Sequence, residues 1–399
     1  MDLLLPARHL APAERGPDAD PVAHRPPVRH LAALVLAIAG TLPVSAAAAG
    51  TIRVAVVEGA RAVEVRGPDL EVVALPACEA CPGPRWRATA VRAVVAGSGV
   101  EVDGRRAPGF RLRGEGGLRV NGREYPAALE VLRQGVDLVV VNELPLEAYV
   151  AGVLRAEAGE RWPAEALRAQ AIAARTFAAY HRWLGAGKPY HLVASTAHQL
   201  YAGRVPPGSP VWDAVRDTAG LVLRWEGALF PAFYHAESGG FTEDPRRVFT
   251  ASGMPALRPV VCPFSTGSPH YAWQLDLPLG EVAEALRRHG VDLGQITAIE
   301  VAERTASLRV AAVTVRGTRG AARLRGTDFR RMLGYELLKS TLFAVAVDGV
   351  TARFAGRGYG HGVGLCQWGA RGMAEQGYTA ERILEFYYPG ATLGPLEPR

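Results

Sequence analysis

A glycine-rich run near the C-terminus constrains the fold more than any other stretch of this sequence. Residues 356–370 read GRGYGHGVGLCQWGA and hold six glycines in fifteen positions. Glycine is needed where φ is positive or where a backbone or a ligand approaches closely. The run is not framed by a strand together with a ribose-binding acid, as a dinucleotide fingerprint requires. We therefore expect a backbone surface around His361 and Gln367 that forms one wall of a site, opposite a wall from elsewhere in the chain.

The N-terminal segment has the pattern of an export signal. Arg25 and Arg29 precede the apolar stretch 31–40, and small residues follow at 44–50. An apolar stretch of this length is too short to span a bilayer, and the order is typical of a signal peptide. We expect residues 1–50 to be a disorder-like leader plus signal peptide. The mature chain is then exported, periplasmic or extracytoplasmic, without membrane insertion, unless an uncleaved signal anchors it.

The composition narrows the functional class. The chain has 399 residues, of which 49% are hydrophobic, so it can bury a full core. Its net charge of +6 comes from interspersed arginines and acids, with no run of like charges. This balance favours general attraction to anionic polymers or surfaces over the reading of a nucleic acid. Hydrolysis or transfer on an external polymer is the default enzyme class.

The pattern along the chain predicts an α+β protein with a mixed, β-rich core. We expect an N-terminal β-rich region at 51–135 and a catalytic core at 136–390, with a small α/β insertion at about 277–335. A long Ala-rich helix, 162–184, is predicted at the centre of the core. The other predicted strands are 52–57, 90–95, 118–120, 129–132, 138–141, 221–225, 229–235, 296–304, 308–315 and 351–354, and the other helices are 143–154, 279–288, 326–332 and 379–387.

Two polar residues stand out on the Ala-rich helix. Gln170 and Arg175 lie deepest in its small-residue stretch. Arginine is seldom fully buried without a partner, so an interior Arg175 needs a carboxylate or an anionic ligand. The alternative is an ordinary arginine on the outer face of the helix.

Glu157 is the first of three candidates for the chemistry. It falls at the break between two predicted helices, among Ala and Val, where desolvation raises a carboxyl pKa and suits a general acid. The competing interpretation is a surface glutamate beside Arg155 and Arg161, and Glu160 is a rival acid.

Cysteine and histidine supply the two weaker candidates. Cys366 and His361 could form a nucleophilic pair, but no third residue orients them. The widely spaced His235, Cys262 and His270, with His361, are weak evidence for a metal site. Cys262 and Cys366 can each be a small buried residue. In an oxidising compartment Cys78 and Cys81 favour a local disulfide, although a redox or half-zinc motif stays open.

Five ordered blocks of the chain resemble the SpoIID/LytB family. They are residues 142–157, 163–177, 195–201, 234–240 and 358–370. The family includes stage II sporulation protein D and the amidase enhancer. Its enzymes are lytic transglycosylases that cut the glycan strand of peptidoglycan and prefer strands stripped of stem peptides.

The resemblance implies a site residue by residue. The catalytic acid of the family falls on Glu157. Position 366 is usually serine in the family and is Cys here, which puts its hydroxyl role in question. Some members bind zinc just after the His235 position, but 238–242 hold no cysteine, so neither a metal nor another cofactor is expected. The implied substrate-binding residues are Gln170, Arg175, Gln199, Tyr201, His235, Ser238, His361 and Gln367.

The implied reaction needs one carboxyl group. Glu157 protonates the glycosidic oxygen that leaves N-acetylmuramic acid, and then deprotonates the muramyl 6-hydroxyl, which closes a 1,6-anhydro ring. Arg175 would hold a lactyl carboxylate, and Tyr201 and Trp368 would stack on sugars. The competing class is a protein that binds peptidoglycan or a cell-wall amidase without cutting. A third is an amidase that uses Cys366.

Overall fold

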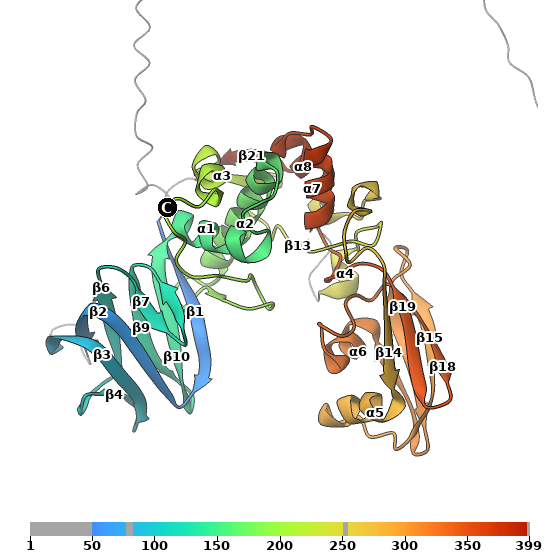
Figure 1. Ribbon diagram of the computed structural model, residues 1–399, viewed down its shortest axis with the longest axis horizontal. Helices are drawn as coiled ribbons and strands as arrows, with labels where there is room; N and C mark the ends of the chain where they lie inside the picture. The colour runs from blue at the N-terminus through green and yellow to red at the C-terminus, as the bar shows by residue number, and fades with distance from the viewer. Residues whose placement is uncertain (1–49, 77–82, 250–253, 397–399) are drawn as a thin grey trace, which may run out of the picture. The chain divides into compact units, whose positions relative to one another are not determined.

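The computed structural model describes residues 50–76, 83–249 and 254–396 (Figure 1). It has 25% helix and 39% strand, which confirms the predicted α+β class. The predicted leader and signal, apart from Gly50, and the Cys78 and Cys81 pair lie outside the described residues. Within the described ranges, no helix is both long enough and apolar enough to cross a membrane.

The N-terminal part of the described chain is an eleven-stranded sheet in the order β11-β1-β10-β9-β6-β2-β3-β4-β5, with β7 paired to β2 and β8. All pairs are antiparallel except β1 with β11. The strands are β1 (Thr51–Ala60), β2 (Ala62–Ala74), β3 (Arg85–Ala96), β4 (Gly99–Val102), β5 (Arg105–Ala107), β6 (Gly109–Gly114), β7 (Leu118–Val120), β8 (Arg123–Tyr125), β9 (Ala128–Gln134), β10 (Asp137–Pro145) and β11 (Leu192–Val193).

Strand β10 continues without a loop into helix α1 (Leu146–Glu157). Pro145 is the N-cap of α1, and Glu147 lies in the first turn, where its charge suits the helix dipole. The sequence places the helix start at 143. The helix begins three residues later because 143–145 still pair with β1.

Helix α2 (Ala164–Leu184) is the central helix of the described core, as predicted. Its alanines are almost all buried, which lets neighbouring backbones approach closely. It packs against α1 and against four elements from later in the chain. These are α3 (Val211–Asp217), β12 (Leu221–Arg224), α7 (Gln367–Glu375) and α8 (Ala380–Tyr387).

Two short strand pairs bring the end of the chain back to the core. Strand β12 pairs with β21 (Thr392–Pro395), and β13 (Tyr234–His235) pairs in parallel with β20 (Leu365–Cys366). The predicted strand at 229–235 is therefore correct only in its last two residues. In the sequence, β13 is followed by helix α4 (Pro245–Val248) and the 3-10 helices Pro255–Leu257 and Pro263–Ser265.

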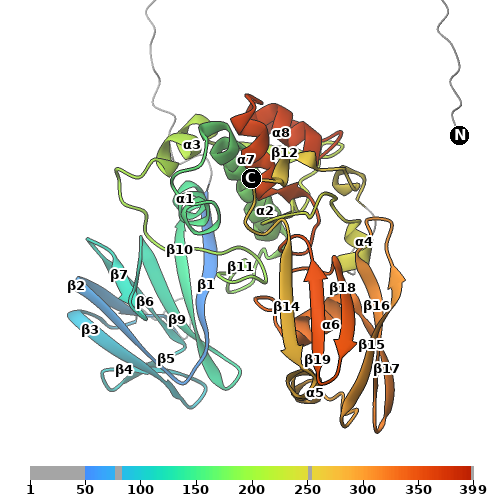
Figure 2. The ribbon, with the colours of Figure 1, turned by 45° about the vertical axis from the view of Figure 1, so that its right-hand side comes forward.

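The region between β13 and β20 contains a unit with its own hydrophobic core, which extends from Trp273 to Phe354. This core begins and ends outside the predicted insertion at about 277–335. Two three-stranded sheets form it, β14-β19-β18 and β15-β16-β17 (Figure 2). The elements are β14 (Trp273–Pro278), α5 (Leu279–Arg288), β15 (Ile296–Arg304), β16 (Val310–Gly317), β17 (Gly320–Arg325), α6 (Gly326–Leu333), β18 (Phe343–Asp348) and β19 (Thr351–Gly356).

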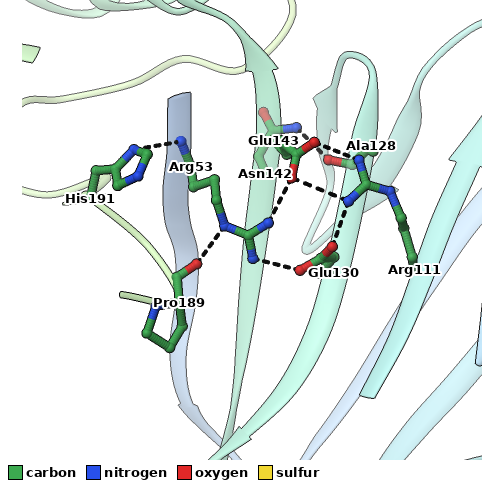
Figure 3. Close-up of polar contacts among 8 residues, drawn as sticks. All are labelled: Arg53, Arg111, Ala128, Glu130, Asn142, Glu143, Pro189 and His191. Atoms are coloured by element: carbon green, nitrogen blue, oxygen red, sulfur yellow. Dashed lines mark hydrogen bonds and ion pairs between the residues drawn. The ribbon is translucent and has the colours of Figure 1, made fainter. Parts of the chain in front are cut away.

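A network of two arginines and two glutamates joins four strands of the large sheet (Figure 3). Arg53 on β1 contacts Glu143 at 2.6 Å and Glu130 at 2.5 Å, and Arg111 on β6 contacts both carboxylates at 2.5 Å. Arg53 also donates to the carbonyl of Pro189. The charges balance, and the network ties the loop before β11 to the strand that leads into α1.

Candidate active site around Glu157

Glu157 is the last residue of α1, and its half-buried carboxylate accepts hydrogen bonds from three parts of the chain. The backbone N–H of Leu200 donates to Oε1 at 2.8 Å. The amide of Gln367, the first residue of α7, donates to Oε2 at 3.4 Å. The hydroxyl of Tyr234, on β13, is the third donor. The structure thus brings the predicted Glu157 and Gln367 together across 210 residues of sequence.

Burial raises the pKa of the Glu157 carboxyl above its ordinary value, because desolvation disfavours the charged form. The hydrogen bonds from Leu200, Gln367 and Tyr234 stabilise the carboxylate and lower the pKa by a smaller amount. The balance keeps a proton on the side chain at higher pH than in water, which is what a general acid requires.

A chain of buried side chains continues from Glu157 into the core. The hydroxyl of Tyr149 donates to Gln199 Oε1 at 3.0 Å, and Gln199 Nε2 donates to the hydroxyl of Tyr234 at 3.0 Å. The predicted Gln199 therefore contacts the acid through Tyr234. Sequence reasoning left Tyr234 out of the site, although it directly precedes His235 in a recognised block.

His235 and His361 lie side by side, with ring centroids 5.5 Å apart. Both ring nitrogens of His361 contact backbone, the carbonyl of Tyr234 at 2.8 Å and the N–H of Val363 at 3.0 Å. Desolvation lowers the pKa of His361 to about 3, so the ring is neutral. His235 contacts the Val363 carbonyl at 3.1 Å, and its Nε2 has no partner among the described residues.

The glycine-rich run has the backbone conformation that its sequence predicts. Its glycines at 358, 360, 362 and 364 all have positive φ, between 71° and 115°. What approaches this backbone is the protein itself. A Cβ at Gly364 would collide with the carbonyl of Phe233, and one at Gly362 would lie 2.6 Å from Arg309. Protein atoms, and not a ligand, therefore occupy the space beside these glycines. The side chains that follow the run are the ones left to contact a ligand.

Cys366 and Ser238 lie inside this packing and not on an open wall. Cys366 is fully buried and is the N-cap of α7, where its Sγ accepts from Gly369 N at 3.3 Å. This is the role that a serine hydroxyl plays at a helix start. Ser238 is also fully buried, and its backbone N–H donates to the same sulfur. Cys366 is therefore the small buried residue that the sequence allows, and in this conformation its sulfur is not exposed to act on a stem peptide.

Arg175 is fully buried and paired with a carboxylate, as an interior arginine requires. Its Nε and Nη2 donate to Glu147 at 2.9 Å and 2.6 Å, and Nη1 donates to the carbonyl of Leu221 at 3.2 Å. The geometry favours a structural role over the predicted contact with a lactyl carboxylate. Gln170 is 1% exposed, and neither of its amide atoms has a partner among the described residues.

Of the two predicted aromatic contacts, only Trp368 is partly exposed. Tyr201 is 2% exposed, lies against Gly152 of α1 and donates to Asn142 at 2.9 Å, so stacking of Tyr201 on a sugar is excluded in this conformation. Trp368 makes an edge contact with Trp162, with ring centroids 5.7 Å apart. These two half-buried rings come from the segments that directly follow Glu157 and Gln367, and Trp162 is a neighbour that sequence reasoning did not single out.

In the described part of the chain, no group of three or more His, Cys, Asp or Glu side chains could hold a metal ion.

Two stretches match known families. Residues 134–225 match the Stage II sporulation protein family, and residues 264–364 match a domain of unknown function. Stage II sporulation protein D of Bacillus amyloliquefaciens is 33% identical over 308 residues, covering 72% of this chain and 86% of that protein.

The chain belongs to the stage II sporulation protein D family. An uncharacterized protein of Brachyspira hyodysenteriae is 32% identical over 286 residues, or 71% of this chain and 76% of that protein. The amidase enhancer of Bacillus subtilis is 30% identical over 291 residues, which are 61% of this chain and 40% of that protein. The resemblance drawn from the five sequence blocks is thus confirmed at the level of the family.

Proposed function

We propose that this protein is an exported lytic transglycosylase that cleaves peptide-free glycan strands of peptidoglycan. Family membership supports a role at the cell wall. The observation that carries the enzymatic assignment is the Glu157 carboxyl, whose pKa is raised by desolvation and which three donors hold at the end of α1.

Glu157 acts twice in the proposed reaction. Its proton passes to the glycosidic oxygen between N-acetylmuramic acid and N-acetylglucosamine as that bond breaks. The resulting carboxylate accepts the proton of the muramyl 6-hydroxyl, whose oxygen bonds to the anomeric carbon and closes the 1,6-anhydro ring. Gln367 and Leu200 stabilise the carboxylate between the two steps, and one side chain suffices as acid and then base.

The test of this assignment is Glu157→Gln. A positioned general acid contributes about 10²- to 10⁴-fold, so the variant should release anhydromuramyl products from peptide-free sacculi at least about 100-fold more slowly. The matched control is Glu160→Gln, because Glu160 lies beyond the same helix break and contacts Ser209 at 2.8 Å. Undiminished release by folded Glu157→Gln protein, measured by mass spectrometry, would sink the assignment.

A second candidate function is that of an amidase enhancer that does not cut glycan itself. The similarity to the Bacillus subtilis amidase enhancer supports it, over 40% of that protein. The two functions differ in one experiment. Purified protein is incubated with peptide-free sacculi alone and with intact sacculi plus a cell-wall amidase. Release of anhydromuramyl products by the protein alone supports the enzyme, whereas stimulation of the amidase without such products supports the enhancer.

A further inference from the structure

Two buried cysteines from distant parts of the sequence meet behind the glycine-rich run. Cys262 precedes the 3-10 helix Pro263–Ser265, and Cys366 caps α7. Both are 0% exposed, and their side chains are hydrogen-bonded to each other. They belong to the same hydrophobic cluster of the core.

Gly369 shows how closely the two sulfurs converge. Its backbone N–H donates to Cys366 Sγ at 3.3 Å. A Cβ placed on the same glycine would lie 2.7 Å from Cys262 Sγ. Both sulfur atoms therefore lie against one residue in the first turn of α7, and a side chain at this position would enter the space that Cys262 Sγ occupies.

The surroundings of the pair favour one ionised and one neutral thiol. Cys262 Sγ lies 3.0 Å from the hydroxyl of Tyr387. The hydrogen bond from Cys366, reinforced by Tyr387, lowers the pKa of the Cys262 thiol, whereas burial raises the pKa of the Cys366 thiol. A thiolate is the form that attacks a disulfide, so Cys262 is suited to begin thiol–disulfide exchange.

We propose that Cys262 and Cys366 are an oxidation site and form a disulfide bond in the exported protein. While the exported chain folds, before the core closes over the two sulfurs, the Cys262 thiolate attacks a disulfide of low molecular weight or of an oxidant protein, which releases one thiolate and leaves a mixed disulfide. Cys366 loses its proton, attacks Cys262 Sγ and expels the second thiolate. The two cysteines lose two electrons and two protons in total, and the oxidant disulfide becomes two thiols. The proposal rests on export, which is part of the proposed function.

The bond would close a loop of about a hundred residues that contains the whole unit between the two cysteines. It would also fix the start of α7 immediately before Gln367, whose amide donates to Glu157. The cross-link is therefore a brace for one wall of the candidate active site, formed only where the compartment is oxidising.

The first experiment maps thiols in the full chain secreted through an oxidising compartment. The background variant Cys78→Ser/Cys81→Ser removes the other two cysteines. The protein is denatured with an alkylating agent, before or after reduction, and is weighed intact and as peptides. We expect no alkylation before reduction, two alkyl groups after it, and a cross-linked peptide that contains both cysteines. Alkylation of both residues without reduction would overturn the proposal.

A second experiment uses stability, because alkylation alone does not show that the bond braces the fold. In the same background, reductant should lower the Tm by about 5–10 °C. Reductant should leave the Tm of the Cys262→Ser/Cys366→Ser variant unchanged, because that variant cannot form the disulfide. Serine at position 366 keeps a capping oxygen for α7. An equal response of both proteins to reductant would contradict the proposal. Neither measurement uses glycan cleavage, so either result leaves the Glu157 assignment to its own test.

Discussion

Tyr234 connects Glu157 to the buried side chains of Gln199 and Tyr149, and removal of its hydroxyl should change the pKa of Glu157. The hydroxyl donates to the Glu157 carboxylate and lowers the pKa of that group. In Tyr234→Phe the pKa of Glu157 should rise. Because the acid must be protonated to act, the alkaline limb of the pH–rate profile should move to higher pH. Loss of the buried hydroxyl should also cost about 1–2 kcal/mol of stability, measured by urea unfolding.

Tyr388→Phe is the matched control for this change. Tyr388 is fully buried, and its hydroxyl donates to the carbonyl of Phe233 at 2.8 Å. Its loss should cost a similar free energy of unfolding and leave the alkaline limb where it is. A profile that moves equally in both variants would show that the effect comes from general loosening of the core.

The wild-type pH profile follows from the same carboxyl. Desolvation raises the pKa of Glu157, so the protonated, active form persists to higher pH than for a glutamate in water. Cleavage should therefore continue above pH 4.5, the ordinary value, and decline only as the pH passes the raised pKa. Initial rates on peptide-free sacculi between pH 4 and pH 9 measure this limb. A decline centred at or below the ordinary value would contradict the predicted environment.

Among single residues, the sequence predicted identities better than contacts. The sequence and its family resemblance predict Glu157, Gln199 and Gln367 as site residues, and the structure places them in one hydrogen-bonded group through Tyr234. A block that resembles a family motif singles out its residues, but it does not indicate whether each one faces a substrate or the core. Tyr201 illustrates this limit, because its ring fills the space beside a glycine that lies 49 positions away.

Among the helices, α1 depends on Gly152, the glycine that lies beside the Tyr201 ring. A Cβ at Gly152 would collide with the Tyr201 ring and lie 2.8 Å from the carbonyl of Gly203. Gly152→Ala should therefore destabilise the protein by about 1–3 kcal/mol through overpacking, despite the better helix propensity of alanine. Gly280→Ala in α5 is the control. Nothing lies within 4 Å of a Cβ there, and the change should stabilise by about 0.5 kcal/mol. Urea unfolding distinguishes the two signs.

The sheet network makes a prediction about acid stability. The hydrogen bond from Arg111 lowers the pKa of Glu143 below its ordinary 4.5. A lowered pKa in the folded state contributes stability above the unfolded value and loses it as the pH falls. Glu143→Gln should thus cost about 1–2 kcal/mol at pH 7 and less at pH 3.5. Glu64→Gln, at an exposed pair with Arg66, should change little at either pH. Equal costs of Glu143→Gln at both pH values would refute the linkage.

The predicted elements failed where tertiary contacts decide the conformation. Residues 143–145 carry helix-start signals, but backbone pairing with β1 holds them in strand. Residues 229–233 alternate like a strand, yet the chain pairs with β20 only at Tyr234 and His235. In both places the local pattern is ambiguous, and a partner far away in the sequence determines the outcome.

For the whole molecule, the sequence predicted the α+β class, the central Ala-rich helix and the five blocks that identify the family. It did not predict that the β-rich N-terminal strands join into one eleven-stranded sheet, or that the glycine-rich run folds against β13. The order of the strands depends on which apolar faces pack together after the chain turns. The sequence of a short Gly or Pro turn does not indicate that order. The proposed domain boundaries stay predictions.

Because β10 continues directly into α1, the position of the large sheet fixes the position of the Glu157 carboxyl. Glu157 stands twelve residues beyond Pro145 on a helix with no intervening loop. Each residue of an α-helix turns the chain by about 100° and advances it by about 1.5 Å. One extra residue within β10 would also reverse which side chains face the core. Length changes at the β9–β10 turn, around Gly135, do not alter the distance along the chain from β10 to Glu157. A single insertion between β10 and Glu157, in contrast, would turn the carboxyl away from Gln367.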